Sequence, residues 1–161
     1  MEIEMSIKGL MVDPITNMPI IVLREVEGQR VLPIWVGVFE ANAIALQIEK
    51  VQTPRPMTHD LLKTVIAELG GSVERIVVCS LKDNTFYATL HVHSPKGLLR
   101  VDARPSDAIA LALRSGARVF VEEEVIQSAR SVEMSREAVD VGRLQKWLEG
   151  LSDEELGKYK M

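Results

Sequence analysis

The sequence predicts an α+β fold, with a mainly antiparallel sheet, packed helices and a single domain that carries a C-terminal helical extension. The chain has 161 residues, a length that suits one domain. Apolar segments typical of strands alternate with segments whose apolar residues recur about every 3.6 positions. The turns between neighbouring strands are of hairpin length, which favours antiparallel pairing. We expect the domain to span residues 1–131 and the extension to span residues 132–161.

The first third of the chain is rich in strands. Residues 3–12, 19–23 and 31–36 consist mostly of Ile, Val, Leu and Met. A hairpin turn centred on Gly28 separates the second of these segments from the third.

Two helices are predicted next. Apolar residues recur with helical period over residues 39–50, and Thr53–Pro56 then breaks the chain. A second helix begins at Thr58, a good N-cap residue, and ends at Gly70. Its expected apolar face consists of Leu61, Leu62, Val65, Ile66 and Leu69.

Three further strands are predicted over residues 73–81, 86–93 and 98–103. The turns between them fall at Asp83-Asn84 and at Pro95–Gly97, where the residue types favour tight turns.

The helix predicted over residues 106–114 is apolar on nearly all sides, so we expect it to be buried. It stops at Gly116. A short strand at 119–121, a helix over 122–130 and a polar connector over 131–137 follow.

The extension beyond this connector carries an amphipathic stripe made of Val141, Leu144, Trp147, Leu148 and Leu151. Such a stripe needs a partner surface, either on the same domain or on a second subunit, and of these we expect a homodimer.

Composition excludes several classes of protein. With 19 basic and 23 acidic residues the formal net charge is −4, which excludes a strongly basic nucleic-acid binder of the histone type. The acidic N-terminus lacks the features of a signal peptide, and no stretch approaches about 20 apolar residues. We therefore expect a cytoplasmic protein without membrane contact. The single cysteine, Cys79, lies in an apolar run and is expected to be a buried structural thiol.

Two segments stand out by their polar residues. Residues 55–60 (Arg-Pro-Met-Thr-His-Asp) and 102–107 (Asp-Ala-Arg-Pro-Ser-Asp) each place Arg-Pro, then a hydroxyl residue, then Asp at the start of an apolar helix. A helix N-terminus with unpaired N–H groups beside an arginine is suited to binding phosphate. We expect both segments to face a common pocket.

Each residue type in these segments suggests a role. The candidate substrate-binding residues are Arg55, Thr58, Arg104 and Ser106, and the candidate catalytic residues are His59, Asp60, Asp102 and Asp107. His59 is suited to act as a general acid or base. Asp60, Asp102 and Asp107 are candidate ligands for a divalent cation such as Mg or Mn, with Glu40 as a weaker candidate.

Plainer interpretations of the same residues stay open. Taken alone, each segment is more typical of a helix start, in which Thr58 or Ser106 caps the helix. The clusters also suit a non-catalytic module, in which they bind an anionic ligand, pair the subunits of an oligomer or lock the helix entrances through internal salt bridges.

Two further groups of side chains are given structural interpretations. His91 and His93 share one strand face, a spacing more typical of a solvated face than of a metal site. Trp35 and Phe39 are expected in the core.

Several segments, in their order and spacing, resemble the bifunctional nuclease domain, a family found in bacteria and plants. They are Leu32–Gly37 with Glu40-Ala41, Arg55–Leu61, Phe86–Ala88, Asp102–Ala112 and Glu123–Val125. The resemblance covers about residues 1–130 and implies an α+β domain with nuclease activity on DNA, RNA or both. Residues 1–131 carry 14 basic and 16 acidic side chains, so we expect nucleic-acid binding to be weak and salt-sensitive.

Overall fold

A computed structural model describes the backbone of residues 1–135 and the side chains of residues 1–129. The elements in chain order are β1 (Glu2–Val12), β2 (Pro19–Glu25), β3 (Val31–Trp35), α1 (Val38–Ile48), α2 (Thr58–Glu68), β4 (Ser72–Lys82), β5 (Thr85–Ser94), β6 (Gly97–Ala103), α3 (Pro105–Ser115), β7 (Arg118–Glu122) and α4 (Glu123–Ser135). The predicted order of strands and helices is confirmed.

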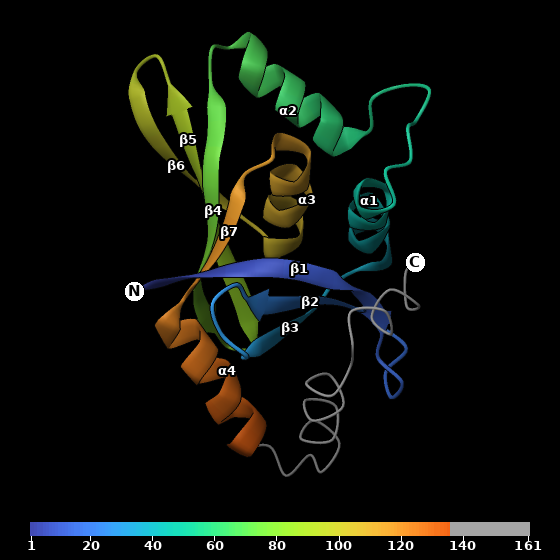
Figure 1. The fold of residues 1–161 in the computed structure, drawn as a ribbon, viewed down its shortest axis with the longest axis vertical. Coiled ribbons are helices and arrows are strands. Elements are labelled where there is room, and N and C mark those ends of the chain that lie inside the picture. Colours follow the sequence, from blue (N-terminus) through green and yellow to red (C-terminus); the bar gives the residue numbers. More distant parts are fainter. Residues whose placement is uncertain (136–161) are drawn as a thin grey trace.

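The strands form one seven-stranded sheet in the order β3-β2-β1-β7-β4-β5-β6. Every neighbouring pair is antiparallel except β4 and β7, which are parallel. The late strand β7 thus joins two antiparallel groups, β1–β3 and β4–β6, into a mixed sheet. In Figure 1, β1 runs across the view whereas β4 and β7 run up it, so the sheet is strongly twisted. The α+β prediction is confirmed.

Local backbone geometry agrees with two turn predictions. Asp83 and Asn84 both have positive φ, 51° and 61°, as a tight hairpin between β4 and β5 requires. Gly116 ends α3 in the left-handed conformation, with φ of 68°, where the lack of a Cβ removes the steric penalty.

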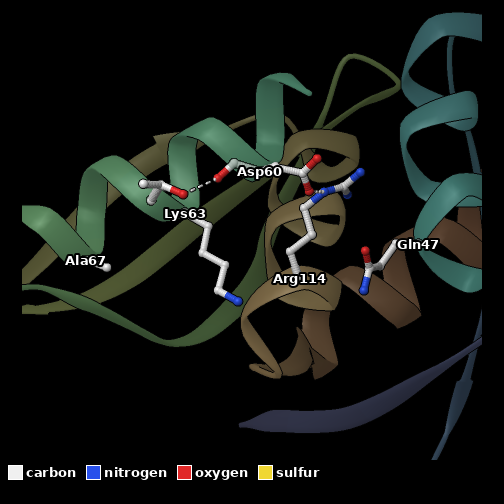
Figure 2. A pocket seen from close by; sticks show the side chains of 6 residues that line it. Gln47, Asp60, Lys63, Ala67 and Arg114 are labelled. Carbon is white, nitrogen blue, oxygen red and sulfur yellow. Dashed lines mark hydrogen bonds and ion pairs between the residues drawn. The ribbon is translucent and has the colours of Figure 1, made fainter. Parts of the chain in front are cut away.

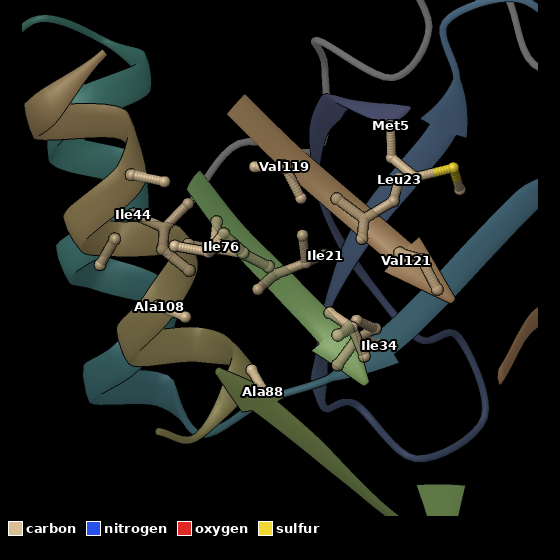
Figure 3. Packing of buried hydrophobic residues seen from close by; sticks show 14 of the residues in the cluster. Met5, Ile21, Leu23, Ile34, Ile44, Ile76, Ala88, Ala108, Val119 and Val121 are labelled. Carbon is tan, nitrogen blue, oxygen red and sulfur yellow. The ribbon is translucent and has the colours of Figure 1, made fainter. Parts of the chain in front are cut away.

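Helix α3 lies at the centre of the core. Its residues Ile109 and Leu111 are fully buried, which confirms the prediction, and Leu113 is partly buried against the same cluster. Figure 3 shows Ile44 of α1 and Ile76 of β4 in this cluster beside α3. The core therefore holds α1 and α3 together on the sheet. This packing also sets the position of the first turn of α3 in space.

Helix α2 is less buried than its sequence pattern suggests. Among the five residues of its expected apolar face, Ile66 packs against the core, and the other four are exposed: Leu61, Leu62, Val65 and Leu69. The reason is its position, since α2 crosses α3 instead of lying flat on the sheet (Figure 1).

Three expectations about individual side chains are wrong. Phe39 is 89% exposed and Trp35 is also exposed, its indole N–H donating a hydrogen bond to Asp13. Cys79 is exposed because the β4–β5 register shifts beside it, between Val78 and Ser80.

The two histidines of β5 also differ from the expectation of a shared solvated face. His93 is exposed, whereas His91 is buried between Arg75 of β4 and Arg100 of β6, its cross-strand neighbours.

Helix α4 continues to Ser135, so the expected connector at 131–137 is helical at least to that residue. The predicted stripe from Val141 to Leu151 lies outside the described residues. Within residues 1–135, no helix is long and apolar enough to cross a membrane.

Candidate functional site

The first turns of α2 and α3 are joined by a pair of side chains. His59 Nε2 lies 2.9 Å from Asp107 Oδ1. The His59 side chain is 11% exposed and that of Asp107 is 33% exposed. The two motif segments predicted to converge therefore do meet, and His59 and Asp107 make the contact.

Arg104 is the second hydrogen-bond partner of Asp107. Its Nε donates to Asp107 Oδ2 over 2.9 Å, and its Nη1 donates to Glu40 Oε1 over 3.0 Å. Burial raises the pKa of Asp107, but the hydrogen bonds from His59 and Arg104 outweigh it, so this pKa lies below its ordinary value. Asp107 is therefore an ionised carboxylate at neutral pH.

The charge of Asp107 determines the state of the His59 ring. Because an ionised carboxylate can only accept hydrogen bonds, His59 Nε2 must carry the proton that it shares with Asp107. In the neutral imidazole, the lone pair then lies on Nδ1. No described residue forms a hydrogen bond to this nitrogen. His59 is thus held in the tautomer whose free nitrogen is a base.

A second ionic contact, beside that of His59 and Asp107, joins the first turn of α2 to α3. Arg114, whose side chain is 4% exposed, donates from Nε to Asp60 Oδ1 over 2.7 Å. Its two terminal nitrogens donate to the carbonyl oxygens of Ala110 and Ala43. Asp60 Oδ2 accepts the Met57 backbone N–H, and this bond and Arg114 hold the pKa of Asp60 below its ordinary value against the effect of burial. Asp60 therefore anchors α2 to α3.

A shallow pocket of about 380 Å³ opens beside this contact (Figure 2). It is lined by Gln47 of α1, by Asp60, Lys63, Thr64 and Ala67 of α2, and by Arg114 of α3.

The family model described as the bifunctional nuclease domain matches residues 21–134. The chain belongs to the bifunctional nuclease domain family. Two proteins from two strains of Mycobacterium tuberculosis are each 44% identical over 126 residues, which cover 78% of this chain and 75% of each relative. Both relatives are described as uncharacterized proteins. His59 and Asp107 lie within the matched part of this bifunctional nuclease domain.

Some of the expected site residues lie apart from this network. Asp102 lies on β6 opposite Thr89 and is exposed. Arg55 is exposed, and its carbonyl oxygen accepts a hydrogen bond from the Thr53 hydroxyl. Neither Asp102 nor Arg55 forms an ion pair with a described residue.

The expected helix caps are also displaced. The N-cap residues are Met57 for α2 and Arg104 for α3, and neither caps through its side chain. Thr58 and Ser106 therefore lie inside the first turns. Thr58 is exposed, and Ser106 is buried.

The expected cation site does not form in this arrangement. Across residues 1–129, no three His, Cys, Asp or Glu side chains are gathered so that they could hold a metal ion. The physical reason is that Asp60 bonds to Arg114, Asp107 bonds to His59 and Arg104, and Asp102 lies on a separate strand. The three aspartates of this nuclease-family domain do not fit a shared Mg or Mn site.

Sequence reasoning did not include Arg114 in the site. A signal was available, because an arginine near the end of a helix that is apolar on nearly all sides has to bury its guanidinium and find acceptors. Gln47 and Lys63 gave no such signal, since their place in the pocket depends on how α1, α2 and α3 cross.

Proposed function

We propose that this chain is a phosphodiester hydrolase that acts on DNA, RNA or both. In this proposal His59 is the general base that takes a proton from the attacking water and the general acid that protonates the leaving oxygen. The observation that carries this proposal is the 2.9 Å contact between His59 and Asp107, which leaves Nδ1 free as a base. Membership of the bifunctional nuclease domain family supports the reaction class.

The proposed step balances with water as the attacking group and with His59 as the base and then the acid. His59 Nδ1 takes a proton from water as the water oxygen attacks phosphorus. The bond from phosphorus to the leaving oxygen breaks, and that oxygen departs with the electron pair. The proton on Nδ1 then passes to the leaving oxygen, which gives a phosphomonoester and an alcohol. Asp107 stabilises the imidazolium formed between the two transfers.

Two arginines are suited to hold the phosphate. Arg104 lies next to the His59–Asp107 pair, and its side chain is 65% exposed, which leaves part of the guanidinium open to substrate. Arg55 belongs to the segment that leads into α2 and is exposed. A planar guanidinium donates two parallel hydrogen bonds to phosphate. With so few cations, substrate binding should be weak, and added salt should weaken it further.

A non-catalytic, anion-binding or oligomeric module is the second candidate. One specific observation favours it: Asp60, Asp107 and Glu40 are all engaged by arginines, and the ring of His59 is mostly buried. In that case the network serves as a lock that fastens α2 to α3.

Cleavage of end-labelled single-stranded DNA and RNA by the purified full-length chain separates these candidates. The variants are Asp107→Asn and, as a matched control, Asp102→Asn, with each reaction run in EDTA, in Mg²⁺ and in Mn²⁺. The proposal predicts cleavage in EDTA by the wild type and by Asp102→Asn, and strongly reduced cleavage by Asp107→Asn. Equal cleavage by wild type and Asp107→Asn, or none in any condition, would favour the second candidate.

A further inference from the structure

Strand β6 is an open edge of the sheet. The two edge strands are β3 and β6. Residues 31–34 of β3 are buried, whereas residues 97–102 of β6 are all exposed. The pairing of β6 with β5 is continuous, without a bulge, and β6 contains neither Pro nor Lys. Proline, lysine and bulges are features with which proteins often block an edge, and β6 has none of them. Its outer backbone groups can therefore pair with another strand, and its charged residues, Arg100 and Asp102, limit which strand fits.

The side chains of β6 divide into two faces. Leu99 and Val101 lie opposite the buried Val92 and Leu90, so they point to the core side of the sheet. They are nevertheless 47% and 43% exposed.

Arg100 and Asp102 lie on the other face of β6, opposite His91 and Thr89 of β5. Neither one forms an ion pair or a side-chain hydrogen bond with another described residue. Two opposite charges at alternate positions of an open edge are thus left without partners among residues 1–129.

We propose that β6 pairs in antiparallel fashion with β6 of a second copy of this chain, about a two-fold axis at Val101. A two-fold axis perpendicular to the sheet keeps the side chains of both copies on matching faces. Residues that face each other across the new strand pair must point to the same face, so the axis has to lie between one residue and the same residue of the partner. An axis at Val101 places Arg100 opposite the partner's Asp102, and Asp102 opposite the partner's Arg100.

Neighbouring registers lack this complementarity. An axis at Arg100 or at Asp102 places two like charges directly opposite each other, which is destabilising. An axis at Leu99 places Arg100 opposite Leu98, so no ion pair forms. The charges of β6 are therefore complementary to those of a second β6 strand in antiparallel orientation. For this reason we identify the strand that pairs with β6 as that of a second copy of the chain. The register also covers Leu99 and Val101 with apolar side chains of the partner.

Disulfide trapping tests this register directly. In a Cys79→Ser background, Val101→Cys places two thiols across the axis, where the Cα atoms of an antiparallel pair are about 4.5–5.5 Å apart, within the range of a disulfide. Leu99→Cys is the matched control, because it lies on the same face, and its two copies would be about 13 Å apart. Mild oxidation should link Val101→Cys into a covalent dimer and leave Leu99→Cys monomeric. No dimer with Val101→Cys, or equal yields with both, would overturn the proposal.

A charge exchange provides a second measurement that does not depend on oxidation. Arg100→Asp and Asp102→Arg each turn two attractive pairs into repulsive ones, and each should raise the dimer dissociation constant about tenfold or more. The double variant Arg100→Asp/Asp102→Arg restores both pairs and should dimerise like the wild type. Sedimentation equilibrium of the full chain gives these constants. A wild type that stays monomeric, or a double variant no better than the single ones, would contradict the two-fold pairing.

Discussion

His59 Nε2 and Asp107 Oδ1, 48 positions apart in sequence, lie 2.9 Å apart and join the first turns of α2 and α3. The Asp60–Arg114 contact ties the first turn of α2 to the far end of α3. Since most of the apolar side chains of α2 are exposed, these two polar contacts contribute much of what positions this helix. The contacts of the candidate site therefore also hold the fold together. Substitutions in the site have to be measured for their effect on stability as well as on activity.

Asp60→Asn should destabilise the protein. The substitution removes the charged acceptor of Arg114, whose guanidinium stays buried, and hydrogen bonds to charged groups are worth roughly 1.5–3 kcal/mol. Urea unfolding at pH 7 measures this loss. Glu68→Gln is the control, because Glu68 lies on the same helix and is exposed, and it should change stability by less than about 0.5 kcal/mol. Equal stability of the two variants would show that the Arg114 contact does not hold α2.

Leu111→Ala should cost roughly 2–5 kcal/mol, because Leu111 is fully buried at the centre of α3 and the substitution leaves a cavity. Leu61→Ala, on the exposed side of α2, should change stability by less than about 0.5 kcal/mol. Both values follow from urea unfolding. A loss below about 1 kcal/mol for Leu111→Ala would be inconsistent with a buried α3.

Acid should destabilise the protein through Asp107. Its pKa is lowered in the folded state, so it contributes stability above the pKa of the unfolded chain and loses that contribution as pH falls through the folded pKa. The unfolding free energy of the wild type should therefore drop steeply below pH about 4. Asp107→Asn should be less stable at pH 7 and should show a shallower drop. Parallel curves from pH 7 to pH 3 would show that Asp107 does not gain its charge-dependent contacts in the folded protein.

His91 gives a separate pH effect at higher pH. Burial, and next the nearby charge of Arg75, lower its pKa, Arg100 acts in the same direction, and the carboxylates of Glu2 and Glu74 oppose them. The unfolded chain therefore binds a proton more readily, and stability should decrease as pH falls below about 6.5.

His91→Gln should remove this slope between pH 7 and pH 5. The same substitution at His93, which is exposed, should leave the slope unchanged. A wild-type slope that persists in His91→Gln would assign the effect to another group.

Much of the fold could be predicted from local sequence. Hydrophobic period and turn residues identified the strands and helices, as at Asp83-Asn84 and Gly116, because these features act over a few residues. The insertion of β7 between β1 and β4, the exposure of α2 and the exposure of Cys79 could not be predicted in this way. They depend on which distant strands pair with each other and on where the register of a strand pair shifts. The local pattern of apolar and polar residues determines neither the pairing nor the register.

The candidate site was predicted in part. The Arg-Pro-hydroxyl-Asp pattern identified His59, Asp107 and Arg104, which the structure does bring together. Asp102 was expected in a shared cation site because it is a carboxylate close in sequence to the expected phosphate site. Asp102 lies instead on the edge strand β6, and Asp60 is hydrogen-bonded to the buried Arg114 at the far end of α3.

The single-turnover cleavage rate of His59→Gln, measured beside its melting temperature, tests the central claim most directly. Loss of an acid–base group costs about 10²–10⁴-fold in rate, so we expect a decrease of that size for labelled single-stranded DNA or RNA. His93→Gln, which changes an exposed histidine of β5, should cleave at the wild-type rate. If a folded His59→Gln protein also cleaves at the wild-type rate, His59 does not move the proton, and the contact with Asp107 only holds α2 to α3.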